Sequence, residues 1–261
     1  MNIKKDTRFE FGQNWNLYSK SISDVEVNLA KQGIIKLMPP KMILDRKSFL
    51  DIGCGSGIHS IAANILGFRS ITATDFDLKS VKTAISNKKS FNSKINIFQD
   101  DILNTKIKNK FDIVYSWGVL HHTGNMEKAI LNSRELVNDE GYLIIAIYKK
   151  TFFCKMWYFI KKLYCNSPYF IQKIFNYVFY TLRLSLYLIK GNKLNNYKKI
   201  RGMNLYFDSI DWLGGFPYES ASKEEISSIV GKDFHLEKFY DAKPRIGLMG
   251  SACSEFVFKK K

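Results

Sequence analysis

Cysteine is scarce in this sequence, and its spacing follows no recognisable pattern. The four residues are Cys54, Cys154, Cys165 and Cys253. Cysteine metal sites and disulfide frameworks both use closer, paired spacings. We therefore expect reduced thiols and a cytoplasmic protein.

Long uninterrupted apolar runs are also missing. The N-terminus, MNIKKDTRFEFGQNW, lacks the continuous apolar stretch of a secretion signal. The most apolar region, 151–190, has basic residues at intervals, whereas a membrane span needs about 20 mostly apolar residues. We interpret it as two or three amphipathic helices, broken at Pro168, that form a lid. Peripheral contact with a membrane surface is the alternative, because lysine and aromatic residues suit an interface.

Acidic residues are few. The chain has 24 Asp and Glu against 40 Lys and Arg, a net charge of +16. Such a surface attracts anions, so nucleic acid, acidic lipid and phosphorylated small molecules are all candidate partners. Charge alone does not choose among them. The 46% apolar content of these 261 residues is enough for one large packed domain with an elaborated cap.

Short apolar segments alternate with longer amphipathic ones between about Lys47 and Tyr148. Five segments have the composition of buried strands: Ser48–Ile52, Ile71–Thr74, Ile95–Phe98, Phe111–Tyr115 and Tyr142–Tyr148. The helix-like segments between them are Ile58–Leu66, Leu78–Phe91 and Met126–Val137. Two more strand candidates follow, Phe234–Tyr240 and Ser254–Phe258. The alternation predicts an α/β fold, a doubly wound and mostly parallel sheet.

A glycine-rich turn follows the first predicted strand, in the segment FLDIGCGSGIHS. The strand ends in Asp51, and glycines stand at alternate positions: Gly53, Gly55 and Gly57. Glycine lets the backbone turn sharply and approach a ligand without a Cβ in the way. The dinucleotide fingerprint G-x-G-x-x-G needs glycine at position 58, where this chain has isoleucine. The turn therefore departs from the pyrophosphate-binding pattern.

Acidic residues end the next two predicted strands. Asp75 ends the second strand, where a carboxylate can accept hydrogen bonds from ribose hydroxyls, and Phe76 after it can pack on a purine. Asp101, followed by Ile102, ends the third strand, where a carboxylate can accept from an adenine amine. Asp100 competes for that role, and either residue can instead cap a turn.

These motifs together resemble a known family. The segments FLDIGCGSG, ITATDFD, QDDIL and FDIVYSWGVLHH are similar to the ordered motifs of class I methyltransferases that use S-adenosylmethionine (SAM). The resemblance covers roughly Phe49 to Tyr148. It implies a seven-stranded sheet whose last strand is antiparallel, with a helical cap inserted after the fifth strand. It also implies SAM as cofactor and S-adenosylhomocysteine (SAH) as product.

The resemblance also implies roles for individual residues. Asp51 and the three glycines face the methionine end of SAM, Asp75 the ribose, and Asp101 with Ile102 the adenine; Trp117 also lies beside the cofactor. The segment RFEFGQNWNLY resembles N-terminal helices that close over the cofactor. Its candidates for that cover are Phe11, Trp15 and Tyr18.

Two adjacent histidines, His121 and His122, follow the fourth predicted strand, where an acceptor meets the cofactor. Methyl transfer depends on alignment and exclusion of water, and a hydroxyl acceptor must also lose a proton. A positioned histidine can serve as that base. We expect a catalytic role for this pair, with His122 ahead of His121, and a structural bond to loop backbone as the alternative.

The segment RGMNLYFDSIDWLGGFPYES is expected to be a loop that binds the acceptor. Its candidate residues are Arg201, Trp212, Tyr218 and Glu219. Aromatic rings stack, acids accept hydroxyl hydrogen bonds and arginine holds phosphate, which suits a sugar or a nucleotide-linked sugar. The stretch GGFPYE also resembles methyltransferases of bacterial surface-polysaccharide biosynthesis. We therefore expect an O-methyltransferase acting on a sugar hydroxyl.

Three alternatives stay open. The basic charge favours an RNA methyltransferase, although there is no recognisable RNA-binding module and no Asn/Asp-Pro-Pro-aromatic motif, which makes nucleic acid the weaker choice. The second alternative is a peripheral enzyme that methylates a lipid or quinone headgroup. The third is a SAM-binding protein without catalysis.

We divide the chain into four parts. A helical segment, 1–45, covers the cofactor; the SAM-binding α/β core is 46–148; the cap is 149–222; and 223–261 completes the sheet. Ser222 and Glu225 have the spacing of a capping box, which predicts a helix running to about Val230. The histidines and nearby acids form no convincing metal-ligand pattern, so we expect no metal.

Overall fold

The computed structural model describes residues 22–40, 42–194, 197, 204–242 and 252–261. The strands are β1 (Ser48–Ile52), β2 (Ser70–Asp75), β3 (Asn96–Gln99), β4 (Phe111–Trp117), β5 (Val137–Tyr148), β6 (Phe234–Tyr240) and β7 (Cys253–Lys260). The longer helices are α2 (Asp24–Leu37), α3 (Ile58–Ile65), α4 (Leu78–Ser90), α5 (Met126–Glu135), α6 (Cys154–Asn166), α7 (Tyr169–Ile189), α9 (Leu205–Gly214) and α10 (Lys223–Val230). Short 3-10 turns lie at Leu44–Arg46, Ile102–Asn104 and Leu120–His122.

The seven strands form one sheet in the order β3-β2-β1-β4-β5-β7-β6. Strands β1 to β5 pair in parallel, and β7 runs antiparallel to both β5 and β6. The predicted doubly wound, seven-stranded sheet is confirmed. The strand order reverses between β1 and β4, and ligands of such sheets bind beyond the carboxyl ends of the strands at this switch point.

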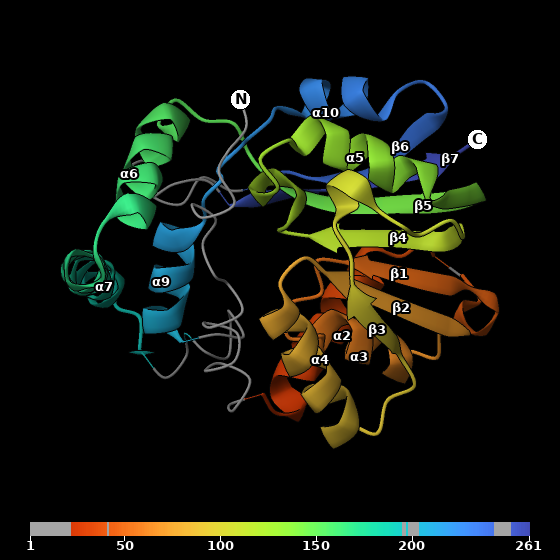
Figure 1. Ribbon diagram of the computed structural model, residues 1–261, viewed down its shortest axis with the longest axis horizontal. Coiled ribbons are helices and arrows are strands. Elements are labelled where there is room, and N and C mark those ends of the chain that lie inside the picture. The colour runs from red at the N-terminus through yellow and green to blue at the C-terminus, as the bar shows by residue number, and fades with distance from the viewer. Residues whose placement is uncertain (1–21, 41, 195–196, 198–203, 243–251) are drawn as a thin grey trace.

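Both faces of the sheet are covered by helices (Figure 1). Helices α2, α3 and α4 lie on one face, and α5 and α10 lie on the other. The side chains of β1 alternate between the two layers: Phe49 belongs to the core beneath α2 and α3, and Leu50 to the core beneath α5 and α10. This alternation is the period-2 geometry of a strand buried on both faces.

Local chemistry sets where the surrounding helices start. The Ser222 side chain accepts a hydrogen bond from the Glu225 amide, and the Glu225 carboxylate accepts one from the Ser222 amide, so the predicted capping box of α10 is confirmed. Ser23 and Glu26 make the same arrangement at the start of α2. Each box satisfies two amides that a helix N-terminus leaves without partners, and so fixes the first turn.

A helical cap follows β5 and lies beyond the carboxyl ends of the parallel strands (Figure 1). It contains α6, α7 and α9, and Figure 1 shows α9 between α7 and the α/β core. Its two ends are adjacent, because the Ala221 amide donates to the Tyr148 carbonyl at 3.1 Å and the Lys150 amide to the Ala221 carbonyl at 3.0 Å. The cap is therefore an insertion between β5 and α10.

One expectation about the cap is wrong. The whole segment 201–222 was expected to be a loop, but residues 205–214 form α9. Asn204 caps this helix, because its side chain accepts from the Phe207 amide at 2.9 Å. The helix buries Leu205, Ser209 and Leu213, which are four residues apart and so share one face. The glycine pair Gly214 and Gly215 marks the end of α9.

Candidate functional site

The glycine turn after β1 lies against the loop after β4. The amides of Gly53 and Cys54 donate to the Thr74 carbonyl, at 2.7 and 2.9 Å, and bind the turn to β2. Gly53 has a positive φ of 75°, and a Cβ on it would lie 2.3 Å from the Val119 side chain. Only glycine fits this position. The turn therefore sits at the switch point between β1 and β4.

Asp75 supports the same turn from the end of β2. Its Oδ2 accepts from the Gly55 amide at 2.9 Å, and its Oδ1 accepts from the Asp77 amide at 2.8 Å. Burial raises the pKa of Asp75 to about 6, although these two hydrogen bonds act in the opposite direction. Phe76, the next residue, is 36% exposed.

Asp51 is buried at the end of β1. Its carboxylate accepts from the Ser60 hydroxyl at 2.5 Å. Burial raises the pKa of Asp51 to about 7, and the nearby Asp75 adds to this shift. A carboxylate with such a pKa, near a second carboxylate, is well placed to be stabilised by a cationic ligand.

The two acids after β3 have different surroundings. Both oxygens of Asp100 accept bonds within its own loop, from the Thr105 hydroxyl at 2.6 Å and the Lys106 amide at 3.0 Å. Asp101 uses one oxygen, Oδ1, which accepts from the Leu103 amide at 3.0 Å. The loop therefore engages Asp100 more fully, which leaves Asp101 as the better ligand candidate. Ile102, beside it, is buried.

Trp117 ends β4 with its ring 39% exposed. Its Nε1 donates to the Glu255 carboxylate at 3.0 Å. His59 of α3, which the sequence analysis missed, lies beside it with ring centroids 6.0 Å apart. Burial lowers the pKa of His59 to about 4, so the ring is neutral at pH 7.

The histidine pair after β4 is packed among aromatic rings. The ring of His121 lies 4.0 Å from that of Tyr148 and 4.3 Å from that of His122. The Nδ1 atom of His122 lies 2.7 Å from the Pro217 carbonyl oxygen, which only accepts. Nδ1 therefore carries the proton, and Nε2 is the basic nitrogen. Burial and the nearby Lys161 lower the pKa of His122 to about 3.

Lys161 of α6 is a second residue that sequence reasoning missed. It is fully buried, its ammonium donates to the Trp212 carbonyl, and it lies 4.0 Å from the centroid of the Trp212 ring. Burial lowers the pKa of Lys161 to about 7, against the opposing effect of Asp211. A signal was present, because Trp157, Lys161 and Tyr164 have helical spacing and form the buried stripe of α6.

Some of the predicted acceptor-binding residues lie in this cluster of aromatic rings and histidines. The ring centroids of Trp212 and Tyr218 lie 5.3 and 5.4 Å from the ring centroid of Tyr148, and Tyr218 is buried. The Glu219 carboxylate accepts from the Met126 amide at 3.0 Å, at the start of α5. Arg201 lies outside the described residues, as do Phe11, Trp15 and Tyr18. Their predicted roles stay predictions.

Three buried nitrogens in the cluster lack partners. Among the described residues, neither ring nitrogen of His121 nor Nε1 of Trp212 has a hydrogen-bond partner. Buried polar atoms are normally paired, so such atoms mark a place that a ligand or water can satisfy. The described part of the chain contains no group of three or more His, Cys, Asp or Glu that could hold a metal.

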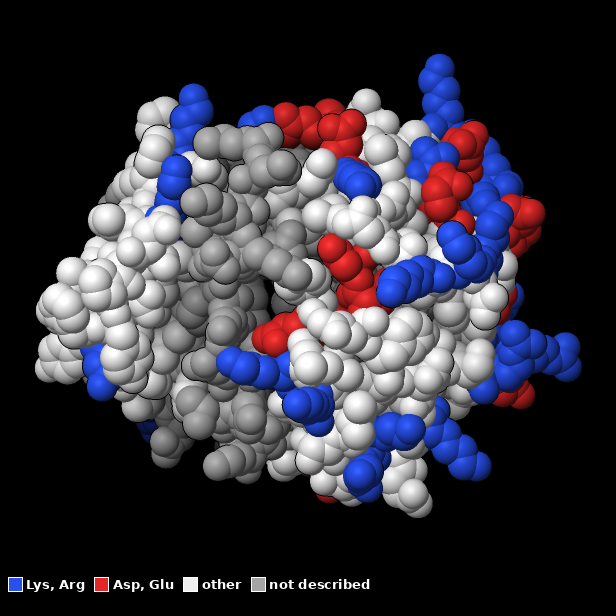
Figure 2. Space-filling view, in the orientation of Figure 1, with Lys and Arg blue, Asp and Glu red and all other residues white. Residues whose placement is uncertain are grey.

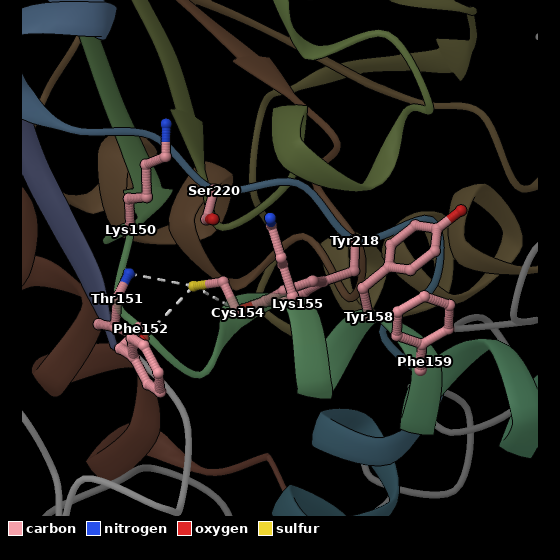
Figure 3. A pocket seen from close by; sticks show the side chains of 9 residues that line it. All are labelled: Lys150, Thr151, Phe152, Cys154, Lys155, Tyr158, Phe159, Tyr218 and Ser220. Atoms are coloured by element: carbon pink, nitrogen blue, oxygen red, sulfur yellow. Dashed lines mark hydrogen bonds between the residues drawn. The ribbon is translucent and has the colours of Figure 1, made fainter.

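A pocket of about 520 Å³ adjoins the cluster at the start of α6. Tyr218 lines it, so the pocket and the histidine cluster share a wall. Figure 3 shows the amines of Lys150 and Lys155 reaching to the same side as Ser220, with the rings of Phe152 and Phe159 below them. The Cys154 thiol accepts from the Thr151 amide at 3.1 Å.

Comparison with known proteins agrees with this arrangement. Residues 50–143 match a family described as "Methyltransferase domain". The chain is 32% identical over 108 residues to a ubiquinone biosynthesis O-methyltransferase of Rickettsia akari, covering 41% of this chain and 43% of the relative. It is 36% identical over 99 residues to a ribosomal protein L11 methyltransferase of Staphylococcus carnosus, covering 37% and 30%. The chain thus spans less than half of these curated relatives.

Solved structures share the fold over most of their length. Magnesium protoporphyrin IX methyltransferase of Synechocystis, solved with SAH, matches with a TM-score of 0.56 and 15% identity, over 90% of this chain and 86% of that one. The N-methyltransferase NodS of Bradyrhizobium japonicum matches with a TM-score of 0.52 and 14% identity, over 88% and 85%.

The fold is thus that of class I methyltransferases, as predicted. Residues 50–143 match a methyltransferase domain, for which SAM is the predicted cofactor. The specific association with polysaccharide biosynthesis finds no support among these relatives.

Proposed function

We propose that this protein is a SAM-dependent O-methyltransferase whose acceptor is a hydroxylated aromatic ring of the quinol type. The observation that carries the proposal is the closeness of the glycine turn to a buried aromatic and histidine cluster. The contact between Gly53 and Val119 lies three residues from His122. Both components of a methyl transfer therefore have a place at one switch point.

The proposed cofactor site lies at the carboxyl ends of β1, β2 and β3. Asp51 and the glycine turn take the methionine end, Asp75 the ribose, and Asp101 with Ile102 the adenine, with Phe76 and Trp117 beside it. The two carboxylates fit a ligand that carries positive charge, because such a charge offsets the loss of solvation that raises their pKa values. When bound, SAM supplies an electrophilic methyl group on its sulfonium.

The aromatic cluster supports a quinol-type acceptor over a sugar. Its unpaired nitrogens suit the oxygen of a hydroxyl, while Tyr148, Trp212 and Tyr218 offer ring faces and edges. A phenolic hydroxyl, with a pKa near 10, loses its proton far more easily than an aliphatic one. The buried ammonium of Lys161 favours the resulting negative charge. The O-methyltransferases of ubiquinone biosynthesis among the relatives point the same way.

His122 takes the role of orienting the acceptor hydroxyl. Its low pKa keeps the ring neutral at pH 7, and in this tautomer Nε2 is the accepting nitrogen. The bond to the Pro217 carbonyl holds the ring in that tautomer. The methyl group moves from the sulfonium to the acceptor oxygen, which leaves SAH, and the hydroxyl proton ends in bulk water, because a base with a pKa of about 3 does not hold it at pH 7.

A labelled-SAM assay tests the proposal. Purified protein is incubated with a short-chain, water-soluble quinol, a nucleotide sugar and bulk RNA, each in a separate reaction. We expect label in the quinol alone. Label in the sugar or the RNA alone would overturn the acceptor class, and absence of SAH binding by calorimetry would overturn the whole assignment.

A matched pair of variants tests His122. His122→Gln should retain SAH binding and lose about 100-fold or more in turnover. His235→Gln is the control, because His235 lies exposed on β6, away from the cluster. Equal turnover of the two variants would exclude His122 from the reaction.

A further inference from the structure

Helix α7 presents an apolar face to the outside of the molecule. Its exposed large side chains are Tyr169, Phe170, Ile174, Tyr177, Val178, Leu182, Leu188 and Ile189. Phe170, Ile174, Val178 and Leu182 recur every four residues, and Ile189 follows Leu182 after seven, two helical turns, so these side chains share one face of the helix. None of the residues of α7 is buried. A surface helix normally turns such a face to the core.

The opposite face of α7 holds the helix in place. Arg183 donates to the Asp208 carboxylate at 2.6 Å, to the Ser209 hydroxyl at 2.9 Å and to the Tyr197 hydroxyl at 2.8 Å. Phe179 packs against Trp157 of α6, with ring centroids 5.7 Å apart. The face that carries Arg183 and Phe179 thus anchors the helix, and each large side chain of the apolar face is at least half exposed.

Helix α6 adds a second amphipathic face. Its exposed residues include Lys155, Met156, Phe159, Lys162 and Leu163, again at intervals of three and four. Apolar and basic side chains therefore alternate along one side of this helix. We call the exposed residues of α6 and α7 together, with Phe152 before them, the α6–α7 surface.

The charge around this surface has one sign. No Asp or Glu occurs between Glu140 and Asp208, a stretch that contains ten lysines and two arginines. Figure 2 shows the end of the molecule that carries α6 and α7 mostly white, with a few blue side chains and no red ones in this view. Apolar side chains with only basic neighbours match the interface of a bilayer that contains anionic lipid.

We infer that the α6–α7 surface docks on an anionic membrane surface. None of the described helices is long and apolar enough to cross a bilayer, so the contact is peripheral. Phe152, Lys155 and Phe159 belong to this surface and also line the 520 Å³ pocket, which places the pocket beside the lipid. The inference deepens the proposed function, because an acceptor with an apolar tail resides in the membrane.

Charge favours a membrane over a second copy of the chain as the occupant. A symmetric dimer would place the same surface on both sides of the contact. Lysines would then face lysines, and the stretch between Glu140 and Asp208 supplies no acid to pair with them. An anionic lipid surface pairs with every one of these charges.

Vesicle sedimentation tests the inference. The full chain is mixed with vesicles of phosphatidylcholine and phosphatidylglycerol in equal parts, or of phosphatidylcholine alone. We expect binding to the mixed vesicles at low salt and at least tenfold weaker binding to phosphatidylcholine. The apolar variant Phe159→Ser/Ile174→Ser/Val178→Ser should bind at least tenfold more weakly, because three exposed side chains no longer enter the interface.

A charge-matched pair separates docking from general attraction. Lys155→Gln/Lys162→Gln/Lys173→Gln removes three positive charges from the α6–α7 surface, and Lys82→Gln/Lys89→Gln/Lys94→Gln removes three from the exposed side of α4 and the loop after it. Only the first should weaken binding, by about tenfold or more. The inference would be overturned if both triple variants weakened binding equally, or if the wild-type chain did not bind anionic vesicles. It would also be overturned if the wild-type chain formed a dimer that the apolar variant dissociates. SAH calorimetry on every variant keeps this result distinct from a failure of the proposed function.

Discussion

The Asp75 carboxylate accepts a hydrogen bond from the Gly55 amide at 2.9 Å and so ties the end of β2 to the turn after β1. The same carboxylate accepts from Asp77, the residue that caps α4. The Asp75 side chain thus fixes the glycine turn and the start of α4 relative to each other. The residue proposed to bind ribose is therefore already fixed by backbone bonds, which reduces the ordering that ligand binding requires.

Replacing Asp75 with asparagine should weaken SAH binding by about 10- to 100-fold. The amide has one oxygen, so it cannot accept from Gly55 and Asp77 and also bind ribose in the same way. Calorimetry with SAH gives the affinity, and Asp45→Asn, in the exposed turn before β1, is the charge-matched control. Wild-type affinity in the Asp75 variant would exclude this residue from the cofactor site.

The affinity for SAM should rise with pH and level off above about pH 7. Asp51 and Asp75 have pKa values raised to about 7 and about 6, so each holds a proton below these values. If the ligand binds the carboxylate forms, each proton must leave first, and affinity falls as pH drops through these pKa values. In Asp51→Asn the upper part of this rise should disappear. A flat wild-type profile from about pH 5 to about pH 8 would contradict the expectation.

Replacing Gly53 with alanine should abolish SAH binding and destabilise the fold. The new Cβ would lie 2.3 Å from Val119, and the residue would have to keep a φ of 75°. Gly67→Ala is the matched control, because Gly67 also has a positive φ but nothing within 4 Å of its Cβ position. Thermal unfolding should show about 1 kcal/mol lost in the control and clearly more at Gly53. Equal losses would mean that the Val119 loop moves aside.

The core of the fold could be predicted because the signals along the sequence agree with each other. Strand–helix alternation, the glycine turn and the acidic strand ends all indicate one topology, and the structure has it. The start of β5 was expected at Tyr142 and lies at Val137. The polar stretch between them does not look like a strand, yet it pairs with β4 through an irregular register.

The cap was less predictable, because tertiary contacts decide its structure. Lysine is almost never fully buried, so the helical spacing of Lys161 with Trp157 and Tyr164 does not by itself predict that Lys161 lies inside the cap. Tyr218 was expected in an open loop, and it packs beneath α6 instead. The histidine environment likewise depends on Pro217, a residue almost one hundred positions away in the chain.

Stability should depend on pH through Lys161. Its folded pKa of about 7 lies below its ordinary 10.5, so between these values the unfolded chain holds a proton that the folded chain lacks. The free energy of unfolding should therefore rise with pH, by about 2 kcal/mol between pH 7 and about pH 9. In Lys161→Met that rise should be missing, since Met has no proton to bind. Urea unfolding of both proteins at the two pH values gives the change in the free energy of unfolding. An equal change in wild type and variant would show that a group other than Lys161 titrates.

Replacing Arg183 with methionine should loosen the cap and leave the cofactor site intact. Arg183 pairs with Asp208, Ser209 and Tyr197, and the Arg183 and Asp208 side chains are only 17% and 16% exposed. Without Arg183, the largely buried Asp208 carboxylate keeps the hydrogen bond from the Tyr197 hydroxyl but loses its counter-ion, at a cost of about 3 kcal/mol. Limited proteolysis should then cut the cap faster than in Lys173→Met, whose substituted residue is exposed on the same helix. SAH affinity should stay at the wild-type value, because Asp51 and Asp75 lie in the α/β core. A cap that resists protease equally in both variants would show that ring packing, as between Phe179 and Trp157, holds it without the ion pair.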